Sequence, residues 1–119
     1  MAFSILNIGD EVKELGASEK RVASKTLLKT EHMRLLLIAI KSGAKMPDHH
    51  VDAPITIHVI AGRVKFSAGK KTVEMNAGMI QPLEPSVVHS VEATEASALL
   101  VTMAWPSVKK LKAIEHRGY

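Results

Sequence analysis

Short runs of β-branched and other apolar residues, each ended by turn residues, restrict the fold of this sequence more than any other feature. Alternating runs of about 4–8 such residues indicate β-strands, and no long helical period appears in the middle of the chain. Strands of this number and spacing predict an all-β sandwich or barrel. We expect strands at Phe3–Ile8, Val22–Thr30, Met33–Lys41, Ile55–Ala61, Arg63–Ala68, Thr72–Asn76, Met79–Leu83, Val87–Ala93 and Ser97–Trp105.

Glycine and proline stand between most of these runs, where the chain has to turn. Gly43, Pro54, Gly62, Gly69 and Gly78 are the main examples. Such residues supply turn geometries that β-branched residues resist. Their positions therefore support the strand boundaries given above.

Two short helical pieces are expected near the ends of the chain. Asp10 is a candidate cap for a helix over Glu11–Leu15, with acidic residues near the favourable N-terminal end. Near the C-terminus, Val108, Leu111 and Ile114 follow an i, i+3, i+6 spacing. This apolar stripe is expected to pack on the barrel or on a partner subunit.

The bulk composition is that of one globular domain spanning residues 1–119. Hydrophobic residues make up 46% of the chain and charged residues 24%, both ordinary values. There is no cysteine, which excludes disulfides, thiolate metal ligands and a cysteine nucleophile. No apolar run approaches the ~18 residues of a membrane span, and Met1–Ile8 lacks the basic region of a secretory signal. We therefore expect a cytoplasmic protein that does not enter a membrane.

The net charge of +4 is only mildly basic. Nucleic-acid-binding proteins concentrate basic residues on one surface and add stacking aromatic residues. Here the aromatic residues are two Phe, one Trp and one Tyr, and the basic residues are scattered. We expect a solvated surface and no nucleic-acid partner.

Period-two alternation separates two of the histidines. Neighbouring strand residues face opposite sides of a sheet, so His89 lies on the inward face with Val87 and Val91. In Ile55–Val59 the same rule turns His58 outward. His89 is thus the better candidate for an interior site.

The run Met33–Lys41 has no polar face over its central Leu and Ile residues. A strand covered on both sides explains such a pattern. In a small barrel one of these covers is often another subunit, so we expect a homodimer.

Asp48, His49 and His50 form a loop rich in nitrogen and oxygen donors, and His89 arrives from a distant strand. Imidazole and carboxylate groups suit divalent transition metals such as Zn, Fe, Mn and Ni. We therefore take these four residues as candidate metal ligands. Alternatives stay open: His89 as a hydrogen-bonded core residue, His49 and His50 as loop residues, and Asp48 as an Asx-turn residue.

At these residues the chain resembles the cupin superfamily. One cupin motif is glycine, five residues, His-x-His, three or four residues, glutamate, six residues and glycine. Here five residues lie between Gly43 and His49, as the motif requires. Val51 stands at the position of the second histidine and Ile55 at that of the glutamate. Gly62 stands at the position of the final glycine. Counting back from Ile55 instead selects Asp48 and His50. Only one of these registers can face the interior.

The second cupin motif is glycine, five residues, Pro-x-Gly, two residues, histidine, three residues and asparagine. Here Gly78 is followed after five residues by Glu-Pro-Ser ending at Ser86, then by two valines and His89. Ala93 stands at the asparagine position. The resemblance spans roughly Leu35 to Met103 and implies a double-stranded β-helix, or jelly-roll, barrel.

Three functions are compatible with this resemblance. The first is a metal-dependent enzyme of dioxygenase or isomerase type, with a divalent metal in the barrel. The second is a non-catalytic module that binds a small apolar or anionic ligand, with or without metal. The third is a regulatory dimer with a vestigial pocket. Fold alone does not choose among them.

Overall fold

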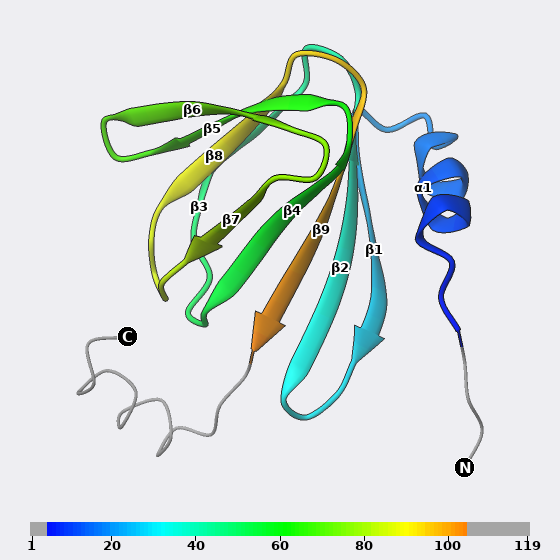
Figure 1. The fold of residues 1–119 in the computed structure, drawn as a ribbon, viewed down its shortest axis with the longest axis horizontal. Coiled ribbons are helices and arrows are strands. Elements are labelled where there is room, and N and C mark those ends of the chain that lie inside the picture. Colours follow the sequence, from blue (N-terminus) through cyan, green and yellow to red (C-terminus); the bar gives the residue numbers. More distant parts are fainter. Residues whose placement is uncertain (1–4, 105–119) are drawn as a thin grey trace.

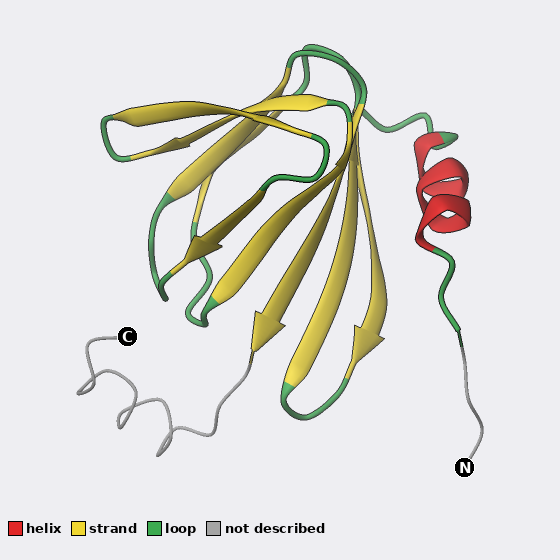
Figure 2. Cartoon of the chain, viewed as in Figure 1, coloured by secondary structure: helices red, strands yellow, loops and turns green. Residues whose placement is uncertain are grey.

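A computed structural model describes residues 5–104, in which nine strands form two antiparallel sheets and one helix lies outside them (Figure 1). The all-β architecture predicted from the sequence is confirmed (Figure 2). The elements are α1 (Ile8–Gly16), β1 (Val22–Lys29), β2 (Met33–Ile40), β3 (Lys45–His49), β4 (Ile55–Ala61), β5 (Arg63–Ala68), β6 (Lys71–Asn76), β7 (Ile80–Leu83), β8 (His89–Ala93) and β9 (Ser97–Ala104).

The two sheets face each other, and the loops between strands carry the chain from one sheet to the other. One sheet has the order β1-β2-β9-β4-β7 and the other has the order β3-β8-β5-β6. The non-consecutive neighbours β2 and β9, and β3 and β8, are characteristic of a jelly roll rather than a meander. This topology brings β3 and β8, which are far apart in sequence, into direct pairing.

The core fills the space between the inner faces of the two sheets. On β4 the residues Ile55, Ile57 and Val59 are buried while those between them are only half-buried, as alternation requires. His58 therefore lies on the outer side, as predicted. Leu99 on β9 is 1% exposed, and truncating such a side chain to alanine typically costs about 2–5 kcal/mol of stability.

Helix α1 covers part of the outer face of β1 and β2 (Figure 1). The Glu11 carboxylate on the helix accepts a hydrogen bond from Lys25 Nζ on β1 at 2.7 Å. Leu37, an outward residue of β2, is completely buried. The chain's own helix thus supplies part of the second cover that the apolar run Met33–Lys41 requires.

Gly62, at the tight junction between β4 and β5, has a φ of +85°. A Cβ atom at this position would collide with Ser97 Oγ and the Ala96 carbonyl oxygen, and would lie 2.7 Å from Ser97 Cα. Glycine is therefore required both for its conformation and for its lack of a side chain.

Two details at the N-terminal end differ from expectation. The strand predicted at Phe3–Ile8 is wrong over its described part, because residues 5–7 belong to no strand and Ile8 begins α1. The cap is Asn7 rather than Asp10: Asn7 Oδ1 accepts a hydrogen bond from the Asp10 backbone N–H at 3.0 Å. Asn7 precedes Asp10 by three residues, the spacing of a cap and its backbone donor.

One strand in the structure was not expected from the sequence. Strand β3 was not expected, because Pro47 lies within it and proline is rare inside strands. Trp105 and the predicted helix with Val108, Leu111 and Ile114 lie outside the described residues. Within residues 5–104 no helix is both long and apolar enough to span a membrane.

Candidate functional site

A β-bulge in β3 turns His49 toward the interior. Met46 pairs with Val91 and His49 pairs with His89, so β3 has one more residue than β8 between these two pairs. The extra residue reverses the alternation after Met46, and both Met46 and His49 then line the same cavity. Pro47, which has no N–H to donate, lies within this bulge.

The imidazole of His89 is an interior group, as predicted, with only 2% of the residue exposed. Its Nδ1 lies 2.9 Å from the carbonyl oxygen of Val87, and its ring stacks on Phe66 with centroids 5.7 Å apart. Burial lowers the pKa of His89 below its usual value of 6.5, against the opposing effect of the Val87 hydrogen bond. The ring is therefore neutral at pH 7.

His49 makes the same kind of backbone contact from the neighbouring strand. Its Nδ1 lies 2.8 Å from the carbonyl oxygen of Pro47. The centroids of the His49 and His89 rings are 4.2 Å apart, and the rings meet at 61° in an edge-to-face arrangement. The structure thus brings together two of the four candidate site residues.

A cavity of about 140 Å³ lies between the sheets beside these two rings. Apart from the two histidines, its lining residues are all aliphatic or methionine. They come from β2, β3, β4, β8, β9 and the loop after β3: Leu36, Ile38, Met46, Val51, Ile55, Ile57, Val91, Leu99, Val101 and Met103. An apolar protein cavity of about 150 Å³ is large enough to take up benzene.

The other two candidate residues, Asp48 and His50, lie on the surface. His50 Nε2 is 3.6 Å from Asp52 Oδ1, an exposed pair that does not reach the cavity. The spacing from Gly43 to His49 therefore gives the inward register, and the count back from Ile55 does not. The bulge explains why: it displaces the alternation by one residue.

The residues around the cavity do not fit the divalent metal that the resemblance to cupins implies. Catalytic zinc sites usually have three protein ligands, and structural sites have four. Over residues 5–104, no three His, Cys, Asp or Glu side chains gather closely enough to hold a metal ion together. At the positions where the cupin motif has its second histidine and its glutamate, Val51 and Ile55 line the cavity instead. Two imidazoles in this apolar setting do not match the donor set of such a site.

The loop that carries Val51 is fixed by Ser86, which stands where the cupin motif has a glycine. Ser86 has a φ of +68°, the only positive φ of a non-glycine residue in the described chain. Its backbone N–H donates to the Val51 carbonyl oxygen at 2.8 Å, and its hydroxyl donates to Asp52 Oδ1 at 2.9 Å. Ser86 thus adopts a left-handed conformation that a glycine at this position would adopt without steric cost.

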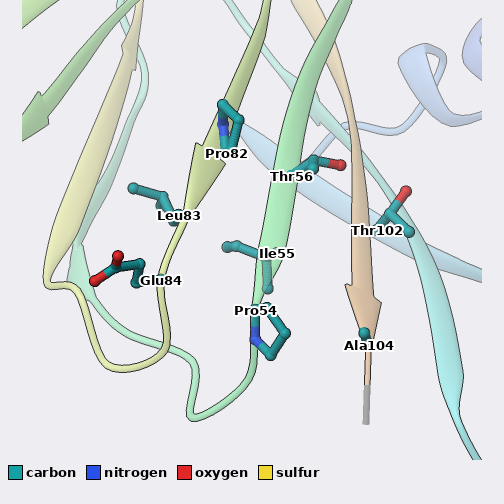
Figure 3. Close-up of a pocket in the computed structure, with 8 residues that line it drawn as sticks. All are labelled: Pro54, Ile55, Thr56, Pro82, Leu83, Glu84, Thr102 and Ala104. Carbon is teal, nitrogen blue, oxygen red and sulfur yellow. The ribbon is translucent and has the colours of Figure 1, made fainter. Parts of the chain in front are cut away.

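A larger hollow of about 500 Å³ lies elsewhere, at the ends of β4, β7 and β9 (Figure 3). Thr56 and Thr102, which pair across β4 and β9, border it together with Glu84 and Ala104. It contains no histidine and ends at the last described residue. We therefore take the smaller interior cavity, with its paired imidazoles, as the candidate site.

Sequence reasoning found the two histidines of this site but not most of its wall. The inward residues Ile55, Ile57 and Val91 follow from alternation, whereas no pattern in the sequence places Met46 and Met103 beside the cavity. For Val51 the sequence does give an indication, because the Gly43 register places it two residues after His49 and therefore on the same face.

No protein-family model and no curated protein matches the sequence. Solved structures do match the fold. A cupin superfamily protein from Desulfitobacterium hafniense superposes with a TM-score of 0.74 at 10% identity, covering 80% of this chain and 87% of that one. An RmlC-like cupin protein from Desulfovibrio desulfuricans superposes with a TM-score of 0.67 at 22% identity, covering 73% of this chain and 85% of that one.

An uncharacterised conserved protein with a double-stranded β-helix domain from Klebsiella pneumoniae gives a TM-score of 0.75 at 20% identity, covering 87% of this chain and 90% of that one. These likenesses extend over most of each chain, and at such identities they establish the fold. The resemblance inferred from the two glycine-containing motifs is thereby confirmed at the level of architecture: the chain has the cupin fold, a double-stranded β-helix.

Proposed function

We propose that this protein is a binding module that holds a small, mostly apolar molecule, about the size of one aromatic ring, between its two sheets. The observation that carries the proposal is the cavity of about 140 Å³ with aliphatic and methionine walls and two imidazoles on one side. Concave, largely apolar sites with a few polar groups are the usual form of small-molecule pockets.

The affinity expected for such a ligand is modest. Burial of an aromatic ring removes about 150–250 Å² of surface from water. At about 25 cal/mol per Å², this contributes about 4–6 kcal/mol. The corresponding dissociation constants are about 1 mM to 50 μM, before the ligand makes any polar contact.

The groups beside the cavity favour binding over catalysis. Among the described residues that line it, His49 and His89 are the only ones with a titratable side chain. Glu84 borders the other hollow, and Glu92 is exposed on β8. No carboxylate, lysine or tyrosine side chain lines the cavity among the described residues to act with them as a general acid or base.

A divalent metal, Zn, Fe, Mn or Ni, is the competing proposal. It is supported by the His49–His89 pair alone, since both rings bind backbone carbonyls through Nδ1, as metal-ligating histidines often do. The deciding measurement is the metal content of protein purified without added metal or an affinity tag, beside His89→Ala. Near-stoichiometric metal in the wild type that is lost in the variant would favour the metal site over the binding module.

The direct test of the binding module uses toluene and records amide chemical shifts by NMR during a titration. We expect saturable shifts that cluster around the cavity. Val51→Phe, at a half-buried residue of the cavity wall, should fill the space and weaken toluene binding at least about tenfold, equivalent to about 1.4 kcal/mol. Val88→Phe is the matched control, because Val88 is 50% exposed and does not line the cavity.

Two outcomes would count against the module. One is a folded wild type that binds no toluene at millimolar concentration. The other is equal toluene affinity in Val51→Phe and Val88→Phe, since binding would then take place outside the cavity.

A further inference from the structure

We infer that the cavity selects a neutral ligand with a hydroxyl group, of which phenol is the simplest example, and that it discriminates against a carboxylate of the same size. This inference rests on the proposed binding function and specifies its ligand class. It follows from the hydrogen-bonding state of the two imidazoles and from the lack of charge around them.

The backbone contacts fix the tautomer of each ring. The Nδ1 atoms of His49 and His89 lie 2.8 and 2.9 Å from the carbonyl oxygens of Pro47 and Val87. A carbonyl oxygen only accepts hydrogen bonds, so each Nδ1 must carry the proton. In a neutral ring the other nitrogen, Nε2, then has a free lone pair and acts as an acceptor.

Among the described residues, no group forms a hydrogen bond with Nε2 of His89. The residue is 98% buried, and its interactions are the Nδ1 hydrogen bond and the two ring contacts. Yet no described side-chain nitrogen or oxygen is both fully enclosed and without a hydrogen bond. Nε2 must therefore reach accessible space, and the space that His89 borders is the cavity. The hydroxyl of a bound ligand would satisfy this acceptor by donating a hydrogen bond to it.

The cavity offers little to an anion. His89 is 2% exposed beside an otherwise apolar wall. No Lys or Arg lines the cavity among the described residues. A carboxylate placed there would lose its hydration without gaining an opposite charge or a hydrogen-bond donor, because Nε2 only accepts. A hydroxyl donates one hydrogen bond, and its ring occupies the apolar space.

The test compares phenol, toluene and benzoate at pH 7.5, where phenol is neutral and benzoate is charged. Phenol and toluene match closely in size, so the ratio of their dissociation constants reports the hydroxyl contact. Replacement of His89 by leucine removes the acceptor and keeps a side chain of similar bulk. We expect the preference for phenol relative to toluene to fall about 2- to 12-fold in His89→Leu, the worth of one hydrogen bond. His58→Leu, on the outer face, should leave the ratio unchanged.

A second readout needs no variant. In protein labelled with ¹⁵N, phenol should shift the Nε2 resonance of His89 upfield, as a hydrogen bond to its lone pair does, and toluene should not. Benzoate should bind at least about tenfold more weakly than phenol, given the cost of desolvating its charge.

The outcomes separate this inference from the function on which it rests. Suppose that toluene binds but His89→Leu leaves the ratio of the phenol and toluene dissociation constants unchanged, or phenol leaves the Nε2 chemical shift unchanged. Either result would overturn the hydroxyl assignment and leave the binding module intact. Benzoate binding more tightly than phenol would also overturn it. Absence of binding by both toluene and phenol would overturn the module itself.

Discussion

His49 and His89 are cross-strand partners whose ring centroids lie 4.2 Å apart, although forty residues separate them in the sequence. Their meeting depends on two features of the fold. The jelly-roll topology pairs β3 with β8, and the bulge at Pro47 and Asp48 turns His49 to the same face as Met46. The result is a cavity with two imidazoles on one side and an otherwise apolar wall.

Acid should destabilise the protein through His89. Its pKa is lowered in the folded state, so the unfolded chain binds the proton more readily once the pH falls below about 6.5. The contribution to stability is therefore constant above that pH. It is lost as the pH falls from about 6.5 toward the folded-state pKa, with a slope of at most about 1.4 kcal/mol per pH unit.

Urea denaturation between pH 5 and 8 measures this effect. His89→Gln has no titrating group at this position and should show a shallower loss of stability below pH 6.5 than the wild type. His58→Gln, which removes a histidine from the outer face, is the control for the loss of an imidazole as such. Parallel pH profiles for wild type and His89→Gln would contradict the prediction.

The four candidate site residues should divide into two pairs in binding experiments. His49 lines the cavity, whereas Asp48 and His50 are exposed and do not. We expect His49→Ala to change phenol affinity several-fold, because it removes one cavity wall and an imidazole. Asp48→Asn and His50→Ala should leave the affinity within about twofold, since surface substitutions away from a site usually have small effects. Calorimetric titration of the three variants with phenol is the measurement, and an equal loss in all three would argue for a site on the loop surface.

Much of the framework could be predicted from the sequence because it depends on local patterns. Alternation located most strands and turned His89 inward and His58 outward, and the glycine spacing pointed to the cupin architecture. The orientation of His49 could not be predicted, because period-two counting assumes an unbroken ladder and the bulge adds one residue. The packing of α1 on β2 could not be predicted either, since a two-sided apolar strand does not identify what covers it.

Replacement of Gly62 by alanine should destabilise the protein strongly. The left-handed conformation costs a residue with a side chain about 1–2 kcal/mol, and the collision with the Ser97 region adds an overpacking cost of about 1–3 kcal/mol. Gly69→Ala is the matched control: its φ is +61°, and nothing lies within 4 Å of the added Cβ. Thermal and urea unfolding should show a loss about twice as large for Gly62→Ala. Equal losses would mean that the junction relaxes without cost.

Ser86→Gly should raise stability relative to Ser86→Ala by about 1–2 kcal/mol. Both variants lose the hydrogen bond to Asp52, but only glycine adopts a φ of +68° without steric cost. The difference between them therefore isolates the backbone strain that serine accepts at the glycine position of the motif. Urea denaturation of the two variants measures it. Indistinguishable stabilities would show that this loop accommodates a side chain freely.

The homodimer expected from the apolar strand Met33–Lys41 remains a proposal, and the outer face of the five-stranded sheet is where we expect it to form. Helix α1 covers only part of this face; Ile80 on β7, paired with His58, is 54% exposed, and Met33 is 43% exposed. The variant Ile80→Glu would place a charge in such an interface. It should therefore dissociate the dimer into monomers, which sedimentation-velocity experiments would detect. Val88→Glu is the control, because Val88 is similarly exposed at 50% but precedes β8 in the other sheet. A wild type that sediments as a monomer at high micromolar concentration would rule out the dimer. Dissociation caused by both variants alike would place the contact elsewhere.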